Sequence, residues 1–258
     1  PYYMGYVNPE MSLAQNVDKL FFGKNAVLRD EYNRLFASVF VNPDMVKNIV
    51  QLLYTRNAGF TRKEIVEKLE ITDGGRLSSN LNALISSDFI MKYVPFGYGK
   101  REEHYKLVDP FCIFYLHFIW KQKKISEKFW QQNTTSAPVS IWRGFAFENV
   151  CFNHIEQIKR SLGISGVITE TSEWSKKEDD TEGAQIDLLI CRNDNVINMC
   201  EIKYYNGEFR VTKSYYEKIL RRQTILTERI SPKFAIHSTL ITTFGLNNNE
   251  YSGKFEII

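Results

Sequence analysis

The sequence predicts an α+β protein built from more than one domain. At 258 residues the chain is long enough for two domains, and its 43% hydrophobic content is sufficient to form their cores. Apolar residues recur at helical spacing through most of the first half, whereas strand-like runs alternate with amphipathic helices in the second half. These observations predict two main globular parts, preceded by a short helical region and joined by a helical connector.

Composition restricts the broad class of protein. The formal net charge of +3 permits a nucleic-acid partner without requiring one. The four cysteines show no CxxC or zinc-like spacing, which indicates reduced thiols and a cytoplasmic protein. The most apolar run, "FCIFYLHFIW", is too short to span a bilayer, and no signal peptide is visible. We therefore expect no membrane association.

Residues 1–41 are predicted to form a small helical unit. From about Ser12 to Phe40 the apolar residues follow helical periodicity, with a break near "FGKN" and an N-cap at Ser12. The sequence opens at Pro1 rather than at an initiator methionine, so we expect it to be a piece of a longer protein.

Residues 42–109 are predicted to form three helices followed by a two-stranded hairpin. The first helix starts at "NPDMVKN", the second has the capping-box pair Thr61 and Glu64, and the third lies within "GGRLSSNLNALISS". The alternating segment "FIMKYVPFGYGKREEHYKLVD" turns between Pro95 and Gly99. This order of elements is that of a winged helix-turn-helix domain.

The third helix and the hairpin carry the candidate DNA-binding residues. A recognition helix would place its polar side chains in a major groove, and the hairpin would reach the flanking phosphates. The candidates are Arg76, Ser78, Ser79 and Asn82 on the helix and Lys92, Lys100 and Arg101 on the hairpin. Two alternatives stay open: these residues form a solvated face, or the domain docks onto another part of the longer protein.

Residues 110–140 are predicted to be a helical connector, with a domain boundary at "NTTSAPVS". The remaining residues, 141–258, show the order helix, three strands, helix and strand. The first helix is "IWRGFAFENVCFNHIEQIKRSL", and the three strands are "GVITETSEW", "AQIDLLIC" and "VINMCEIKYY". The second helix is "VTKSYYEKILRRQTILTERI", and the last strand is "KFAIHSTLITTF".

Charged residues interrupt the two predicted strands on either side of the "RNDN" turn. If this turn is centred near Asp194, antiparallel pairing puts Asp187 opposite Glu201, and Lys203 shares their face. Two opposed carboxylates repel each other, and Lys203 offsets only part of that repulsion. A divalent cation would offset more, and hard oxygen ligands suit Mg²⁺ or Mn²⁺. Glu148 on the preceding helix is a further candidate ligand, directly or through water.

This arrangement contains the parts that phosphodiester cleavage requires. A metal held by Asp187 and Glu201 would activate a water and polarise the phosphate. Lys203 would orient that water or neutralise the charge that develops on the phosphoryl oxygens. The alternative is an ordinary cross-strand salt-bridge cluster at the surface of the sheet.

Asp187, the tripeptide Glu201-Ile202-Lys203 and the upstream Gly144-x-x-Phe-Glu148 resemble the PD-(D/E)xK nuclease superfamily, in particular its Holliday-junction-resolvase and Mrr-like branch. This resemblance implies a restriction-endonuclease-like αβββαβ fold for residues 141–258. Over essentially its whole length, the chain also resembles the C-terminal region of archaeal-type AAA/STAND ATPases that carry a DUF234-type domain. This second resemblance implies that residues 1–41 are the remnant of an ATPase lid and that the ATPase domain lies upstream in the same polypeptide.

The chain departs from these families in two places. It has no GxxxxGK[ST] motif, so ATP would act only through the upstream domain. Gln185-Ile186 stands where the family often has Glu-Ile, while the four core charged positions are intact. The sequence thus predicts a DNA-binding, metal-dependent DNA-cleaving region coupled to an ATPase. The alternatives are a catalytically silent module that binds DNA or a partner, and a homo-oligomerisation role within an ATP-dependent switch.

Overall fold

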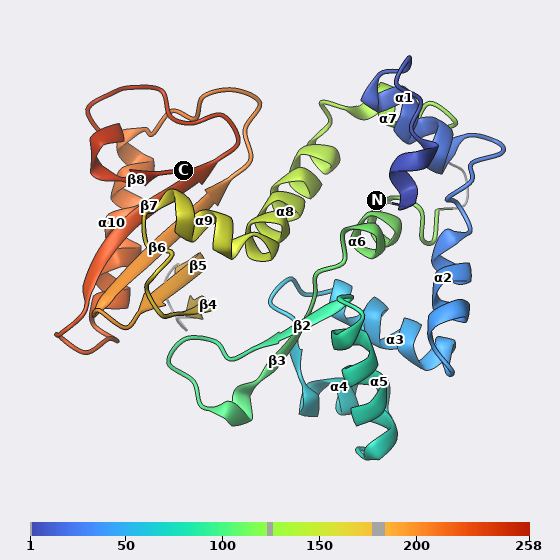
Figure 1. Ribbon diagram of the computed structural model, residues 1–258, viewed down its shortest axis with the longest axis horizontal. Helices are drawn as coiled ribbons and strands as arrows, with labels where there is room; N and C mark the ends of the chain where they lie inside the picture. Colours follow the sequence, from blue (N-terminus) through green and yellow to red (C-terminus); the bar gives the residue numbers. More distant parts are fainter. Residues whose placement is uncertain (1, 123–125, 177–183) are drawn as a thin grey trace. The chain divides into compact units, whose positions relative to one another are not determined.

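The computed structural model describes residues 2–122, 126–176 and 184–258, and it is an α+β structure (Figure 1). The chain divides into two compact units. The first contains Pro1–Lys92 and Tyr105–Arg143, and the second contains Tyr93–His104 and Gly144–Ile258. The tip of the predicted hairpin, Tyr93–His104, thus belongs to the second unit. Within the described ranges, the longest apolar helices fall short of what is needed to cross a bilayer.

The first unit is mainly helical. Its helices are α1 (Leu13–Val17), α2 (Glu31–Val39), α3 (Pro43–Tyr54), α4 (Arg62–Leu69), α5 (Gly75–Ser86), α6 (Pro110–Phe118) and α7 (Phe129–Asn133), with the helical turns η1 (Tyr2–Tyr6) and η2 (Asp18–Phe22). Three short strands, β1 (Phe60–Thr61), β2 (Ile90–Tyr93) and β3 (His104–Leu107), form a sheet in the order β1-β3-β2. The long helix α8 (Ala137–Asn153) starts in the first unit and ends in the second.

The core of the first unit is formed by the apolar faces of α3, α4 and α5. Ile49, Ile65 and Leu84 are fully buried in one cluster. Gly59, just before β1, has a left-handed backbone with φ of +69°, and a Cβ atom there would lie 2.0 Å from the Tyr105 carbonyl oxygen. Only glycine therefore allows β1 to approach β3 this closely.

The two predicted helix starts in this unit are confirmed. Ser12 caps α1 and Thr61 caps α4, each in a reciprocal capping box. In the second box, Glu64 also accepts hydrogen bonds from the Arg56 guanidinium at 2.7 and 2.8 Å. Burial alone would raise the pKa of Glu64, but the hydrogen bonds from Arg56 and Thr61 lower it from 4.5 to about 2.

We expect Glu64→Gln to destabilise the first unit by about 1–2 kcal/mol at neutral pH, because the neutral amide loses the Arg56 pair. Since the folded pKa is lowered, this stability is present above about pH 4.5 and is lost as the pH falls toward about 2. Urea unfolding of both proteins across this range measures the effect. Glu67→Gln, whose partner Lys63 is 3.8 Å away on the exposed face of the same helix, is the matched control and should change little. A deficit that does not depend on pH would contradict this account.

Three helical segments differ from the sequence prediction. The connector is broken into α6 and α7, with a left-handed residue at Lys121. Helix α8 begins at Ala137, inside the predicted boundary segment, where Pro138 is tolerated because the first turn needs no intrahelical N–H bond. The single helix predicted over residues 141–162 ends at Asn153. It resumes as α9 (Ile155–Ser161) after His154, whose φ and ψ of −124° and 32° are not helical.

The second unit contains a five-stranded sheet in the order β4-β5-β6-β7-β8. Its strands are β4 (Thr169–Lys176), β5 (Ala184–Arg192), β6 (Val196–Lys203), β7 (Ala235–Thr242) and β8 (Glu256–Ile257), with α10 (Lys213–Thr227) between β6 and β7 and the turns η3 (Lys100–Glu102) and η4 (Ser252–Lys254). Strands β4, β5 and β6 are antiparallel, whereas β6, β7 and β8 are parallel. The six predicted elements occur in the predicted order, and β8 is an addition.

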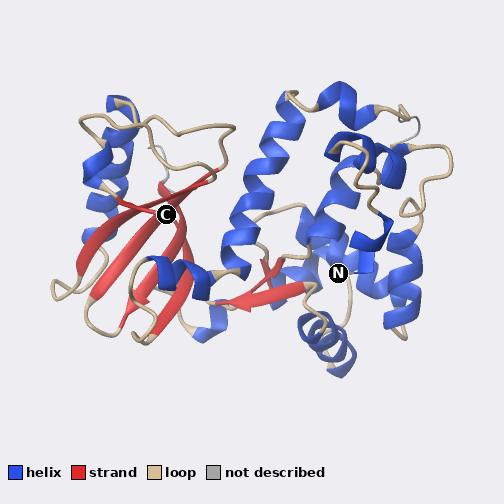
Figure 2. Cartoon of the chain, turned by 45° about the horizontal axis from the view of Figure 1, so that its top comes forward, coloured by secondary structure: helices blue, strands red, loops and turns tan. Residues whose placement is uncertain are grey.

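Helices cover both faces of this sheet (Figure 2). On one face, Ile219 and Leu226 of α10 pack against Met199 and Leu240. On the other face, Cys151 of α8 and Ile158 of α9 belong to a second cluster, whose strand residues include Leu188, Cys200 and Ile241. The sheet therefore has a buried layer on each side, and charged side chains inside it need partners.

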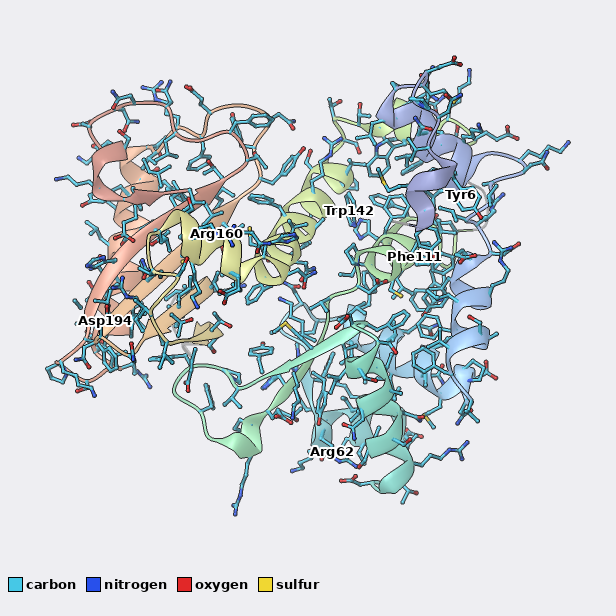
Figure 3. The ribbon with its side chains drawn as sticks, viewed as in Figure 1. Tyr6, Arg62, Phe111, Trp142, Arg160 and Asp194 are labelled. Atoms are coloured by element: carbon cyan, nitrogen blue, oxygen red, sulfur yellow. The ribbon has the colours of Figure 1, made fainter. Side chains whose placement is uncertain are left out.

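The register of the sheet contains a bulge in β5. Ser172 pairs with Leu189, but Trp174 pairs with Ile186, so two residues of β5, Asp187 and Leu188, stand opposite one residue of β4. On the other side of β5, the pairs run from Cys191↔Ile197 to Leu188↔Cys200, which centres the turn on residue 194 as predicted. Asp194 lies at that turn (Figure 3).

Candidate functional site

Asp187 occupies the bulge in β5, where the regular ladder with β6 ends. The last described pair is Leu188↔Cys200, and one step further along the same register is Asp187 beside Glu201. At this point the β6 backbone donates its hydrogen bond to the Asp187 side chain instead of to the β5 backbone. Its Oδ2 accepts a hydrogen bond from the Ile202 backbone N–H at 2.9 Å and another from Lys203 Nζ at 3.3 Å. Bulges commonly re-aim a side chain beside functional sites, and this one fixes a carboxylate at the end of the ladder.

Glu201 is the most buried member of the group, with 1% of its side chain exposed. Its Oε1 accepts a hydrogen bond from Arg222 Nη1 at 2.5 Å. Its Oε2 lies 3.6 Å from Lys203 Nζ and accepts a longer hydrogen bond, 3.4 Å, from the Tyr215 hydroxyl. Lys203 therefore lies between the two carboxylates and contacts both of them.

Burial and the neighbouring cations shift the pKa of Glu201 in opposite directions. Burial raises the pKa of Glu201, and the negative charge of Asp187 raises it further, whereas Lys203 and Arg222 act to lower it. Burial also raises the pKa of Tyr215, with the charges of Glu201 and Asp187 adding to the effect. The Tyr215 hydroxyl therefore stays protonated and is a hydrogen-bond donor to Glu201.

Arg222 and Tyr215 are functional neighbours that the sequence did not assign to the site. Both Tyr215 and Arg222 lie on the face of α10 that also carries Ile219 and Leu226, two buried residues at helical spacing. A cation on the buried stripe of an amphipathic helix requires a buried partner, and this signal was available in the sequence.

Glu148 approaches the same region from α8. Burial raises the pKa of the Cys151 thiol to about 12, and the negative charges of Glu148 and Asp187 contribute to this rise. Both carboxylates therefore act on one buried thiol, from the helix and from the strand.

The donor chemistry of the cluster fits a hard divalent cation through two carboxylates. Among residues 2–122, 126–176 and 184–258, no set of three His, Cys, Asp or Glu side chains is arranged to hold a metal ion. Mg²⁺, however, keeps several waters and commonly uses only one or two carboxylates. Among the described residues, none donates a hydrogen bond to Asp187 Oδ1, so this oxygen would bind a cation without giving up a hydrogen bond. Glu201 would have to exchange its Arg222 or Lys203 contact.

The predicted DNA-binding residues lie on two elements. On α5, Arg76, Ser79 and Asn82 are exposed, while Ser78 is half-buried and donates its hydroxyl to the Gly74 carbonyl oxygen at 3.3 Å. The Arg76 guanidinium lies 2.5 Å from the Asn42 amide oxygen when that amide is oriented to accept. On the hairpin, Lys92 and Arg101 are exposed, and the side chain of Lys100 lies outside the described residues.

An acidic residue lies close to the start of α5. Asp73 accepts two hydrogen bonds from Arg62 of α4, at 2.8 and 2.5 Å. This pair lowers the pKa of Asp73. Asp73 therefore carries its negative charge at the N-terminal end of the exposed α5 face, and Arg62 partly balances it.

Comparison with known proteins identifies no family: no protein-family model matches the chain, and no curated protein matches it.

Proposed function

We propose that the second unit is a metal-dependent DNA-cleaving domain of the PD-(D/E)xK type, with Mg²⁺ or Mn²⁺ as its cofactor. The observation that carries the proposal is the convergence of Asp187, Glu201 and Lys203 at the end of the β5–β6 ladder, with Lys203 Nζ 3.3 Å from one carboxylate and 3.6 Å from the other. The αβββαβ order of elements and the approach of Glu148 from α8 support it.

Each residue has a role in the proposed reaction. Asp187 and Glu201 would hold the cation, with Glu148 as a further ligand through water. The bound cation would supply an activated water and neutralise charge on the phosphate. The Lys203 ammonium, held between the carboxylates, would orient the attacking water or neutralise developing charge on the phosphoryl oxygens. Arg222 and Tyr215 would hold Glu201 in place.

The proposal extends to the first unit and to the longer protein. Helices α3, α4 and α5 with the hairpin would form a winged helix that binds DNA through Arg76, Ser79 and Asn82. The sequence resemblance supports an ATPase domain upstream in the same polypeptide, to which binding and cleavage would be coupled in the cytoplasm. ATP would act only through that domain.

A second function is favoured by the pairing of Glu201. Asp187 and Glu201 contribute two negative charges, and Lys203 and Arg222 contribute two positive charges, so the charges of the cluster balance without a bound metal ion. Such a cluster is stable as a purely structural network. The chain would then be a catalytically silent module that binds DNA or a partner and regulates the upstream ATPase.

Cleavage of labelled DNA distinguishes the two functions. Wild-type chain is incubated with duplex, branched and single-stranded substrates in Mg²⁺ or Mn²⁺, and with a chelator as the control. We expect metal-dependent cutting by the wild type, and none by Asp187→Ala, which lacks one carboxylate of the pair. Binding without cutting on every substrate, repeated with the upstream ATPase domain restored, would support the silent module instead.

A further inference from the structure

Two large aromatic side chains are exposed together near the proposed cleavage site. Tyr205 follows β6 and is 53% exposed, and Phe244 follows β7 and is 64% exposed. Strands β6 and β7 are parallel, and the pair Lys203↔Thr242 ends their shared register. Both aromatic residues therefore emerge at the carboxyl edge of the sheet, two residues beyond the strand ends. Single exposed apolar residues are common, but two at one edge beside a polar cluster are a candidate binding surface.

The loops that follow β6 and β7, which carry these two rings, are hydrogen-bonded to each other. The Tyr205 backbone N–H donates to Thr243 Oγ1 at 3.1 Å, and the Thr243 hydroxyl donates back to the Tyr205 carbonyl at 2.5 Å. Further along, Phe209 forms a parallel bridge with Leu246, with its N–H bonded to the Gly245 carbonyl at 2.9 Å. The two loops thus act as one framework, which positions the rings at low entropic cost to a ligand.

A chain of ring contacts connects this surface to the buried carboxylate. Tyr205 meets Phe209 edge-to-face with centroids 5.9 Å apart, and Phe209 meets Tyr215 in the same way at 5.3 Å. The Tyr215 hydroxyl then donates to Glu201. Lys203, two residues before Tyr205, contacts both carboxylates. A nucleotide whose phosphate lay at the cluster would therefore have its neighbouring bases within the region of Tyr205.

The charge around the two rings suits a polyanion. Arg210, on the connection between β6 and α10, and Lys213, the first residue of α10, are exposed, and Glu208 is the acidic residue among them. The Glu208 carboxylate accepts a bond from the Asn247 side chain at 3.5 Å, which holds it to the neighbouring loop. Basic side chains interleaved with exposed aromatics are the features of a single-strand binding surface, where phosphates track the cations and bases stack on the rings.

We infer that Tyr205 and Phe244 form a stacking platform for unpaired nucleobases, so that the substrate of the proposed cleavage site carries a single-stranded segment. The inference rests on the proposed function for its cleavage step. Inside a duplex each base already stacks on its neighbours and its faces are covered, whereas an unpaired base offers its π face to an aromatic side chain. The platform therefore selects single strands, overhangs or branched structures over continuous duplex.

Binding without metal tests the platform separately from cleavage. The full chain in chelator is titrated with a fluorescein-labelled single strand, with the corresponding duplex, and with an abasic strand of the same phosphate number. We expect Tyr205→Ala and Phe244→Ala each to weaken single-strand binding by about 5- to 150-fold, the range for loss of one stacked base. Tyr205→Phe and Phe244→Tyr should retain single-strand binding. The wild type should bind the abasic strand as weakly as a variant with both Tyr205→Ala and Phe244→Ala binds the normal strand. Ile168→Ala, which removes an apolar side chain that is 73% exposed elsewhere in the unit, is the matched control and should bind as wild type.

The outcomes separate this inference from the proposed function. Alanine variants that bind the single strand as tightly as wild type, or an abasic strand that binds as tightly as the normal one, would overturn the platform whether or not the chain cuts DNA. Base-dependent binding by a chain that cuts no substrate would leave the platform standing and overturn the nuclease. Metal-dependent cutting with preference for unpaired DNA, reduced in the alanine variants, supports both.

Discussion

Lys203→Ala is expected to slow metal-dependent DNA cleavage by about 10²- to 10³-fold while leaving the second unit folded. Lys203 is the only described cation in contact with both Asp187 and Glu201, at 3.3 and 3.6 Å. Its side chain is 31% exposed, so it can reach a substrate phosphate from this position. Asp187 keeps its hydrogen bond from the Ile202 N–H in the variant, which preserves the end of the strand ladder.

The rate constant of a single turnover, measured with enzyme in excess, is the appropriate readout for Lys203→Ala. DNA affinity in Ca²⁺ and the circular dichroism spectrum are recorded in parallel, so that loss of binding or of structure is separated from loss of chemistry. Lys203→Arg keeps the charge and should recover part of the rate. Lys233→Ala removes an exposed cation elsewhere in the same unit and is the matched control. Cleavage by Lys203→Ala at the wild-type rate would remove Lys203 from the reaction.

Arg222→Met is expected to destabilise the second unit by about 2–4 kcal/mol, because it leaves the buried Glu201 carboxylate with only Lys203 as a cationic partner. In the wild type Arg222 Nη1 lies 2.5 Å from Glu201 Oε1. Breaking a buried pair by removing one partner commonly costs about 3–5 kcal/mol. The expected cost here is somewhat lower because Arg222 is partly exposed and Lys203 remains at 3.6 Å.

The pH dependence of that loss follows from the raised pKa of Glu201. Burial is the main cause, and Asp187 adds to it. A carboxyl group whose folded pKa is raised binds more protons in the folded state, so stability falls as the pH rises above about 4.5, the ordinary value. Removing Arg222 raises the folded pKa further. The deficit of Arg222→Met should therefore be larger at about pH 8 than at about pH 5.

Chemical denaturation at both pH values, followed by far-ultraviolet circular dichroism, measures this deficit. Glu201→Gln combined with Arg222→Met should restore most of the stability and flatten its pH dependence, because the buried carboxylate at position 201 is removed together with its cationic partner. Lys218→Met, one turn earlier on the exposed face of α10, is the matched control and should change stability by less than about 0.5 kcal/mol. A double variant no more stable than Arg222→Met would show that the ion pair is not the cause.

Local signals in the sequence predicted the local parts of this structure. The "RNDN" turn placed its centre near Asp194, and the observed register of β5 with β6 has that centre. The N-cap at Ser12 and the capping box at Thr61 also form as predicted. Each of these features depends on residues within a few positions of one another, whose preferences the chain expresses without help from distant partners.

The parts that could not be predicted depend on distant pairing. The bulge at Asp187 exists only because β4 pairs with β5 in a register that shifts between Ser172 and Trp174. Arg222 reaches Glu201 only after the crossover through α10 brings the helix back over the sheet. The strand β8 is two residues long and is defined by its pairing with β7, which no periodicity in so short a segment indicates.

The short strand β8 also forms one edge of the five-stranded sheet. It pairs with Thr239 and Leu240 of the eight-residue strand β7, and so covers backbone in the second half of that strand on which a strand from another molecule could otherwise add. With β8 in place, the outermost strand is two residues long and contains Glu256, whose carboxylate is bonded to His237 and to Asn198. A short, charged edge strand of this kind is a poor template for intermolecular strand pairing, so we expect β8 to reduce strand addition along this part of β7.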